Sequence, residues 1–164
     1  MALAKILDAC CGAKMFWFNK NHPEAIYLDC RKETIEFQGF HSEVDPDVLA
    51  DFTNLPFPDN TFSLVVFDPP HVAWAGPKSW LRATYGVLEE NWPDMISDGF
   101  KECFRVLKPD GVLIFKWSEV QIPLKKVLAC TDHKPLFGNH KPRQSKTHWI
   151  CFMKEDPEAE KRPS

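Results

Sequence analysis

The sequence of 164 residues contains no long apolar run and no pair of cysteines spaced like zinc ligands. A membrane-spanning helix needs about 18 consecutive apolar residues, and no segment comes close to that length. Nothing at the N-terminus resembles a signal peptide, because Asp8 interrupts the only short apolar run there. The six cysteines form no CxxC pair, so we expect reduced cysteines and no metal site. These absences predict a cytoplasmic protein that does not contact a membrane.

The sequence also has no overall excess of basic residues. Its formal net charge is −3 and its pI is near 6.1, so the chain as a whole gives no argument for binding nucleic acid. The charge is nevertheless uneven, because residues 125–154 contain seven cations and a single acid, Asp132. This basic segment is either an ordinary solvated face or a surface for a phosphate backbone. Its cations are Lys125, Lys126, Lys134, Lys141, Arg143, Lys146 and Lys154.

One domain is expected, because 164 residues is an ordinary domain size and 44% apolar residues are sufficient for a core. We place this domain at residues 1–154. Residues 155–164 contain no apolar residue except Ala159, so we predict a disordered tail there.

Short apolar runs alternate with longer segments, which predicts an α/β fold. Four runs indicate buried strands, and an aspartate follows each one: Asp8 after residues 4–7, Asp29 after 25–28, Asp51 after 48–50 and Asp68 after 62–67. The carboxyl ends of parallel strands meet at one edge of a sheet, where α/β proteins bind ligands. Four acids at that edge predict a ligand with several hydrogen-bond donors.

The second half of the chain continues the alternation. Apolar residues at helical spacing predict a helix that begins near Pro93 and ends before Lys108. A strand is expected over 111–117 and a helix over 123–128. A loop over 137–146 then leads to a last strand over 147–153.

Three segments together resemble ordered motifs of the class I S-adenosylmethionine-dependent methyltransferases. They are "ILDACCG" (6–12), "LPFPDNTFSLVVFDPP" (55–70) and "FRVLKPDGVLIF" (104–115), and "KTHWICFMK" (146–154) resembles the end of small bacterial and phage-type members. The resemblance implies a single Rossmann-like domain with helices on both faces. Its sheet of seven strands would be mostly parallel, in the order 3-2-1-4-5-7-6, with the last strand antiparallel.

A cofactor site is predicted near the first two strand ends. Gly12 allows a close approach of the backbone to a ligand, and Asp29 follows 17 residues later, where an acid in such folds binds ribose hydroxyls. The resemblance implies that the ligand is S-adenosylmethionine. It also implies that Asp51 and Phe52 flank the adenine.

By the same resemblance, Asp8 and Cys10 border the methionine part of the cofactor. The loop "ACCGAKMFWF" has a single glycine where the family often has two or three. Lys14 is therefore a candidate for holding the cofactor carboxylate. Cys10 and Cys11 are either binding residues or packing residues.

The stretch "VVFDPPH" (65–71) predicts a clamp for an amine. Asp68 and the carbonyl of Pro69 are able to accept the two N–H bonds of an amine, while Pro69 and Pro70 stiffen the backbone. The stretch resembles the D/N/S-P-P-aromatic signature of methyltransferases that act on exocyclic amines of nucleic-acid bases. The family usually has an aromatic residue where this chain has His71, which is expected to stack on a base, accept a proton or cap the loop.

We expect further substrate contacts from two places. Aromatic residues such as Trp74 are dense over 72–92 and suit either a lid over a planar substrate or the core. Lys141, Arg143 and Lys146 of the basic segment are predicted to contact phosphates.

The leading hypothesis is therefore methyl transfer to an exocyclic amine of adenine or cytosine in nucleic acid. DNA or RNA with a single-stranded or exposed base is the expected partner, and a protein partner or a homodimer would assist target recognition. A second hypothesis is methylation of a small molecule or free nucleoside. A third is a degenerate methyltransferase fold that serves as a binding subunit.

Overall fold

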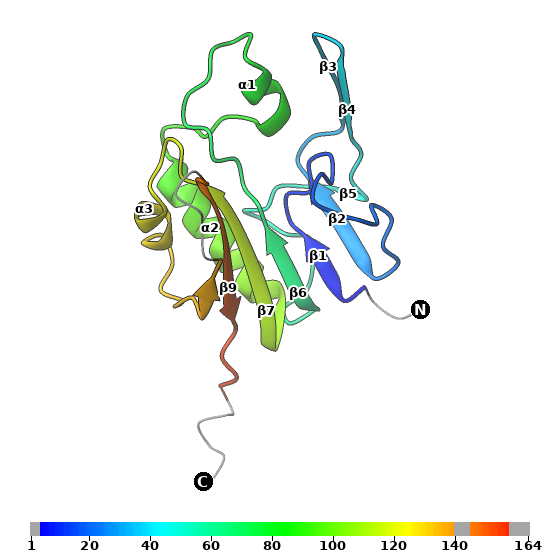
Figure 1. Ribbon diagram of the computed structural model, residues 1–164. Coiled ribbons are helices and arrows are strands. Elements are labelled where there is room, and N and C mark those ends of the chain that lie inside the picture. The colour runs from blue at the N-terminus through cyan, green and yellow to red at the C-terminus, as the bar shows by residue number, and fades with distance from the viewer. Residues whose placement is uncertain (1–3, 140–144, 158–164) are drawn as a thin grey trace.

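The computed structural model describes residues 4–139 and 145–157 and contains a central sheet of seven strands (Figure 1). Their order is β5-β2-β1-β6-β7-β9-β8. The strands are β1 (Ile6–Asp8), β2 (Ala25–Asp29), β5 (Val48–Leu49), β6 (Phe62–Phe67), β7 (Leu107–Ser118), β8 (Phe137–Gly138) and β9 (Thr147–Met153). Neighbouring strands from β5 to β7 are parallel, whereas β9 is antiparallel to both β7 and β8. This confirms the predicted strand order and the antiparallel last strand.

Helix α2 (Trp92–Val106) closes the core on one face of the sheet. Pro93 lies in its first turn, as predicted, and its apolar stripe is buried. The ring of Phe100 lies 5.4 Å from that of Phe67 on β6 and 4.9 Å from that of Phe115 on β7. The helix thereby fixes β6 and β7 relative to each other.

The expectation of helices throughout both faces is wrong for the first half of the chain. In the described residues the helices are α1 (Trp80–Tyr85), α2 and α3 (Leu124–Leu128), and none lies between β1 and β5. Residues 9–24 form a loop instead. The ring centre of Trp17 in this loop lies 4.9 Å from that of Tyr27, and the ring centre of Phe16 lies 5.3 Å from that of Trp149. These aromatic side chains cover part of the sheet face that lies opposite α2.

A hairpin takes the place of the helix that would join β2 to β5. It comprises β3 (Glu33–Phe37) and β4 (Phe40–Val44), joined by Gln38 and Gly39, whose φ angles are both positive. The hairpin and α1 rise above the carboxyl ends of the strands (Figure 1). Phe40 contacts Trp80 of α1 at a ring distance of 5.7 Å. Neither strand of this hairpin was predicted from the sequence.

Smaller differences concern element ends. β7 begins at Leu107 rather than 111, and β8 lies within the segment that was predicted to be a loop. Residues 158–164, most of the predicted tail, lie outside the described residues. No helix in the described part of the chain is both long and apolar enough to span a bilayer.

Replacing Gly99 with valine is expected to lower the free energy of unfolding by about 1–3 kcal/mol. A Cβ at this position on α2 would lie 2.6 Å from Cζ of Phe67 and 2.8 Å from Cδ2 of Phe52, and both rings are buried. Urea unfolding measures the change. Gly76→Val is the control, because a Cβ there meets no atom within 4 Å. Equal losses in the two variants would contradict the described packing of α2.

Candidate active site

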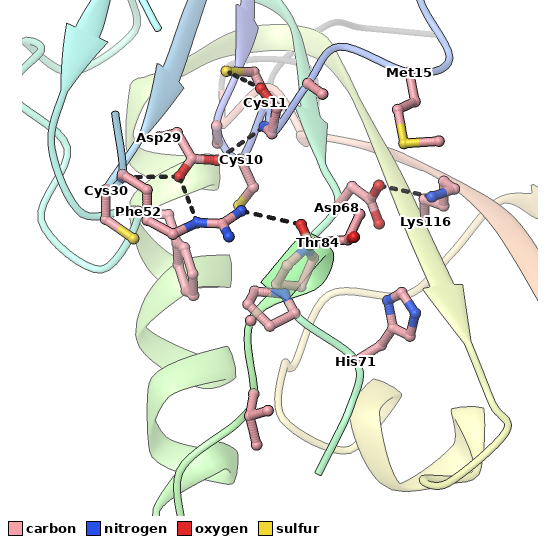
Figure 2. A pocket seen from close by; sticks show the side chains of 18 of the residues that line it. Cys10, Cys11, Met15, Asp29, Cys30, Phe52, Asp68, His71, Thr84 and Lys116 are labelled. Carbon is pink, nitrogen blue, oxygen red and sulfur yellow. Dashed lines mark hydrogen bonds and ion pairs between the residues drawn. The ribbon is translucent and has the colours of Figure 1, made fainter. Parts of the chain in front are cut away.

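A cavity of about 440 Å³ opens at the carboxyl ends of the parallel strands. Its walls come from the segments at the ends of β1, β2, β5 and β6, from the hairpin, from residues 84–95 and from Lys116 of β7. We call it the strand-end cavity. Most of the predicted site residues line it, namely Cys10, Gly12, Asp29, Asp51, Phe52, Asp68, Pro69, Pro70 and His71. Figure 2 shows Asp29 and Asp68 on different sides of this space.

Asp29 ties the first loop to the end of β2. One carboxylate oxygen accepts the backbone N–H of Gly12 at 2.9 Å, and the other accepts that of Arg31 at 2.9 Å. Gly12 has a φ of +49°, and a Cβ built on it would meet no atom within 4 Å. Glycine at this position therefore allows the positive φ angle of the backbone and leaves open space above the loop.

Arg31 connects the cavity to the hairpin and to α1. Nothing in the sequence singled it out. Its Nε lies 3.4 Å from Asp29, its Nη1 lies 3.3 Å from Glu33, and its Nη2 donates to the carbonyl of Thr84 at 3.4 Å. These contacts join β2, β3 and α1. Arg31 therefore couples the hairpin and α1 to the predicted cofactor side of the cavity.

Asp8 lies beneath the cavity and does not line it. The side chain is fully buried, accepts the indole N–H of Trp17 at 2.7 Å and accepts the backbone N–H of Cys10 at 3.3 Å. Burial is the largest cause that raises the pKa of Asp8 from 3.8 to about 7. Asp8 therefore holds the first loop in shape from below.

The contribution of Asp8 to the free energy of unfolding is expected to fall as pH rises toward the folded-state pKa of Asp8. Because that pKa is raised to about 7, the Asp8 carboxyl binds more protons in the folded than in the unfolded state between pH 3.8 and about 7. The contribution of Asp8 to the free energy of unfolding should fall by about 1 kcal/mol per pH unit within this window. Across this window the unfolding free energy of Asp8→Asn should rise more, or fall less, with pH than that of the parent. The exposed Asp98→Asn is the control, and identical slopes for Asp8→Asn and the parent would refute the assignment.

Asp68 directly follows β6, and its two carboxylate oxygens have different surroundings. Oδ2 lies 2.7 Å from Nζ of Lys116, whereas Oδ1 is buried and has no hydrogen-bond partner in the described part of the chain. Figure 2 shows Lys116 approaching Asp68 from the side away from Asp29. Desolvation raises the pKa of Asp68, and Lys116 opposes that rise. An unpartnered buried acceptor is costly, so this oxygen is available to a hydrogen-bond donor from outside the chain.

His71 is placed beside this acceptor. Its ring lies 6.2 Å from the ring of Trp117 and hydrogen-bonds the backbone of Pro69. Proline has no N–H, so the bond uses the carbonyl, which retains a second lone pair. Burial is the largest cause that lowers the pKa of His71, so the imidazole is neutral at neutral pH.

Among the described residues, Lys14, Trp74 and Lys146 do not line the cavity. Nζ of Lys14 lies 4.2 Å from the ring centre of Tyr27, and Trp74 is 77% exposed. Lys146 is exposed, while Lys141 and Arg143 lie outside the described residues. Lys154 donates to the carbonyl of Leu107 at the start of β7, at the opposite end of the sheet. Within the described part of the basic segment, Lys154 therefore lies away from the cavity.

Comparison with known proteins gives structural matches. No model of a known protein family and no curated protein matches the sequence. The PH0226 protein from Pyrococcus horikoshii is 17% identical with a TM-score of 0.62, over 93% of this chain and 82% of that one. A SAM-dependent methyltransferase from Methanosarcina mazei is 15% identical with a TM-score of 0.55, over 94% of each chain.

A third match is the 1,6-didemethyltoxoflavin-N1-methyltransferase from Burkholderia thailandensis, with bound 1,6-didemethyltoxoflavin and S-adenosylhomocysteine. It is 14% identical with a TM-score of 0.52, over 94% of this chain and 72% of that one. At these identities the similarity establishes the fold alone. The chain has the fold of class I SAM-dependent methyltransferases.

Proposed function

We propose that the protein transfers the methyl group of S-adenosylmethionine to an amine nitrogen held at Asp68. The observation that carries this proposal is the state of the Asp68 carboxylate. One oxygen is fixed by Lys116, and the other is buried without a partner beside a cavity at the strand ends. Such an oxygen is suited to accept an N–H from a substrate.

The residues of the strand-end cavity fit S-adenosylmethionine. Asp29 would accept the ribose hydroxyls, because a carboxylate has about four acceptor positions and its neighbours in the chain do not fill all of them. Phe52 and Asp51 would hold the adenine, and the loop 10–12 would hold the methionine part. When bound, this cofactor supplies an electrophilic methyl group on a positively charged sulfur.

The chain's own contribution is to orient the amine. Asp68 and the carbonyl of Pro69 accept N–H bonds, which directs the nitrogen lone pair into the cavity. Methyl transfer leaves the nitrogen with a surplus proton. The neutral imidazole of His71 is able to accept that proton.

The charges around the cavity favour a small neutral or cationic substrate. Among the described residues, the cavity is lined by the acids Asp29, Asp51, Asp68 and Glu89 and by two cations, Arg31 and Lys116. The hairpin adds Glu33, Glu36 and Glu43, which are all exposed. An acidic rim repels a phosphate backbone. The Burkholderia enzyme is a protein of this fold that has a small molecule, 1,6-didemethyltoxoflavin, bound together with S-adenosylhomocysteine.

A base in nucleic acid is the second candidate substrate. It is favoured by the exposed cations Lys125, Lys126, Lys134 and Lys146 and by the exposed ring of Trp74. A polyanion would have to approach from the side of α3 and β9, away from the hairpin. In this case a protein partner or a second copy of the chain would extend the small binding surface.

Transfer of isotope-labelled methyl groups to several acceptors distinguishes the candidates. The parent protein would be incubated with labelled S-adenosylmethionine and with a small-molecule extract, RNA, single-stranded DNA or duplex DNA. We expect label in the small-molecule fraction. Label in nucleic acid, lost at raised salt, would establish the second candidate instead. Cofactor binding without transfer to any acceptor would indicate a binding subunit.

A further inference from the structure

We propose that Lys116 is a positioning residue for methyl transfer: it fixes one oxygen of Asp68 and keeps the other available as a charged acceptor for the amine. The inference rests on the proposed function and deepens it. Lys116 lies on β7, next to the strand whose end carries Asp68. The segment "GVLIFKW" predicted only a strand, and no motif indicated a role for Lys116.

The position of the Lys116 ammonium group is defined on several sides. Nζ lies 2.7 Å from Oδ2 of Asp68, and the two side chains are only 20% and 16% exposed. The ring centre of Phe16 lies 5.5 Å from Nζ, and that of Trp149 lies 5.7 Å away. Phe16 and Trp149 also contact each other edge to face. This aromatic support holds the cation against Asp68.

The ion pair decides what Asp68 offers to a substrate. A carboxylate accepts hydrogen bonds with both oxygens, whereas a protonated carboxyl donates with one of them. Desolvation is the largest influence on the Asp68 pKa and raises it, so loss of Lys116 would favour the protonated form. The other titratable groups that face Asp68 are His71, Asp8 and the thiol of Cys10. Among all of these, Lys116 provides the strongest effect in favour of the charged form.

Lys116→Met is expected to shift the acidic limb of the pH–rate profile to higher pH by about one to three units. Turnover at neutral pH should fall about tenfold or more, because that limb then overlaps neutral pH. Cofactor affinity should stay within about twofold of the parent. Lys116→Arg should restore most of the profile, because it keeps the cation. Lys101→Met removes a cation that is 72% exposed on α2 and serves as the control.

An NMR titration of the Asp68 carboxyl carbon gives a measure that does not depend on turnover. The pKa of Asp68 should be higher in Lys116→Met than in the parent and the arginine variant. Lys116→Gln keeps a hydrogen-bond donor without charge and replaces the methionine variant if that one does not fold. An unchanged Asp68 pKa overturns the inference, and so does a loss of cofactor affinity without such a change, because Lys116 would then hold the cofactor. Absence of turnover from every protein, including the parent, would instead refute the proposed function.

Discussion

Asp68→Ala is expected to reduce turnover by about a hundredfold or more, the range found for positioned polar groups that act on a reacting atom. The variant removes the buried acceptor Oδ1 and the partner of Lys116 together. Cofactor affinity should change little, because Asp68 and Asp29 bind different parts of the reacting pair. Steady-state rates and calorimetric cofactor binding, measured on the same preparations, separate these effects.

Two further variants sharpen the test of Asp68. Asp68→Asn keeps one acceptor oxygen and should retain partial activity, whereas Asp98→Ala removes a carboxylate that is exposed on α2 and should behave like the parent. The account of the amine clamp is abandoned if Asp68→Ala folds, binds cofactor and retains more than about a tenth of the parent rate.

Asp29→Ala is expected to weaken binding of S-adenosylmethionine by about tenfold to a hundredfold, which corresponds to charge-assisted hydrogen bonds to the ribose hydroxyls. The loss has a second origin within the chain. The backbone N–H groups of Gly12 and Arg31 both donate to this carboxylate, so its removal also loosens the loop after β1. Calorimetry with the cofactor product, S-adenosylhomocysteine, measures the affinity without turnover.

Asp45→Ala is the matched control for Asp29. Asp45 follows the hairpin, is 58% exposed on its side chain and pairs with Lys32 at the surface. Its removal should leave cofactor affinity unchanged. If both variants bind the cofactor as the parent does, the ribose is not held at Asp29.

The strands of the first half and the residues at their ends were predictable because their signals are local, whereas the sheet order was implied by the family resemblance. A buried strand requires an uninterrupted apolar run, and an acid directly after it must lie at the carboxyl edge of a parallel sheet. Asp29, Asp51 and Asp68 follow this rule and line the strand-end cavity. Asp8 follows it as well, yet Trp17 and the loop fold over it, which depends on packing that no local pattern encodes.

Arg31 and Lys116 were not predictable for a different reason. The role of Lys116 depends on the register between β6 and β7 and on two aromatic rings that are distant in sequence. The role of Arg31 depends on the hairpin that replaces a helix between β2 and β5. The segment of that hairpin does alternate, with buried Ile35 between exposed neighbours, but the family resemblance implied helices on both faces and no hairpin.

The central claim is that the strand-end cavity binds S-adenosylmethionine, and calorimetry of the parent protein with S-adenosylhomocysteine tests it most directly. The account predicts saturable heat with one molecule bound per chain and a marked loss of affinity in Asp29→Ala. Absence of binding heat at millimolar ligand, from protein that unfolds cooperatively, would contradict the claim and with it the proposed methyl transfer.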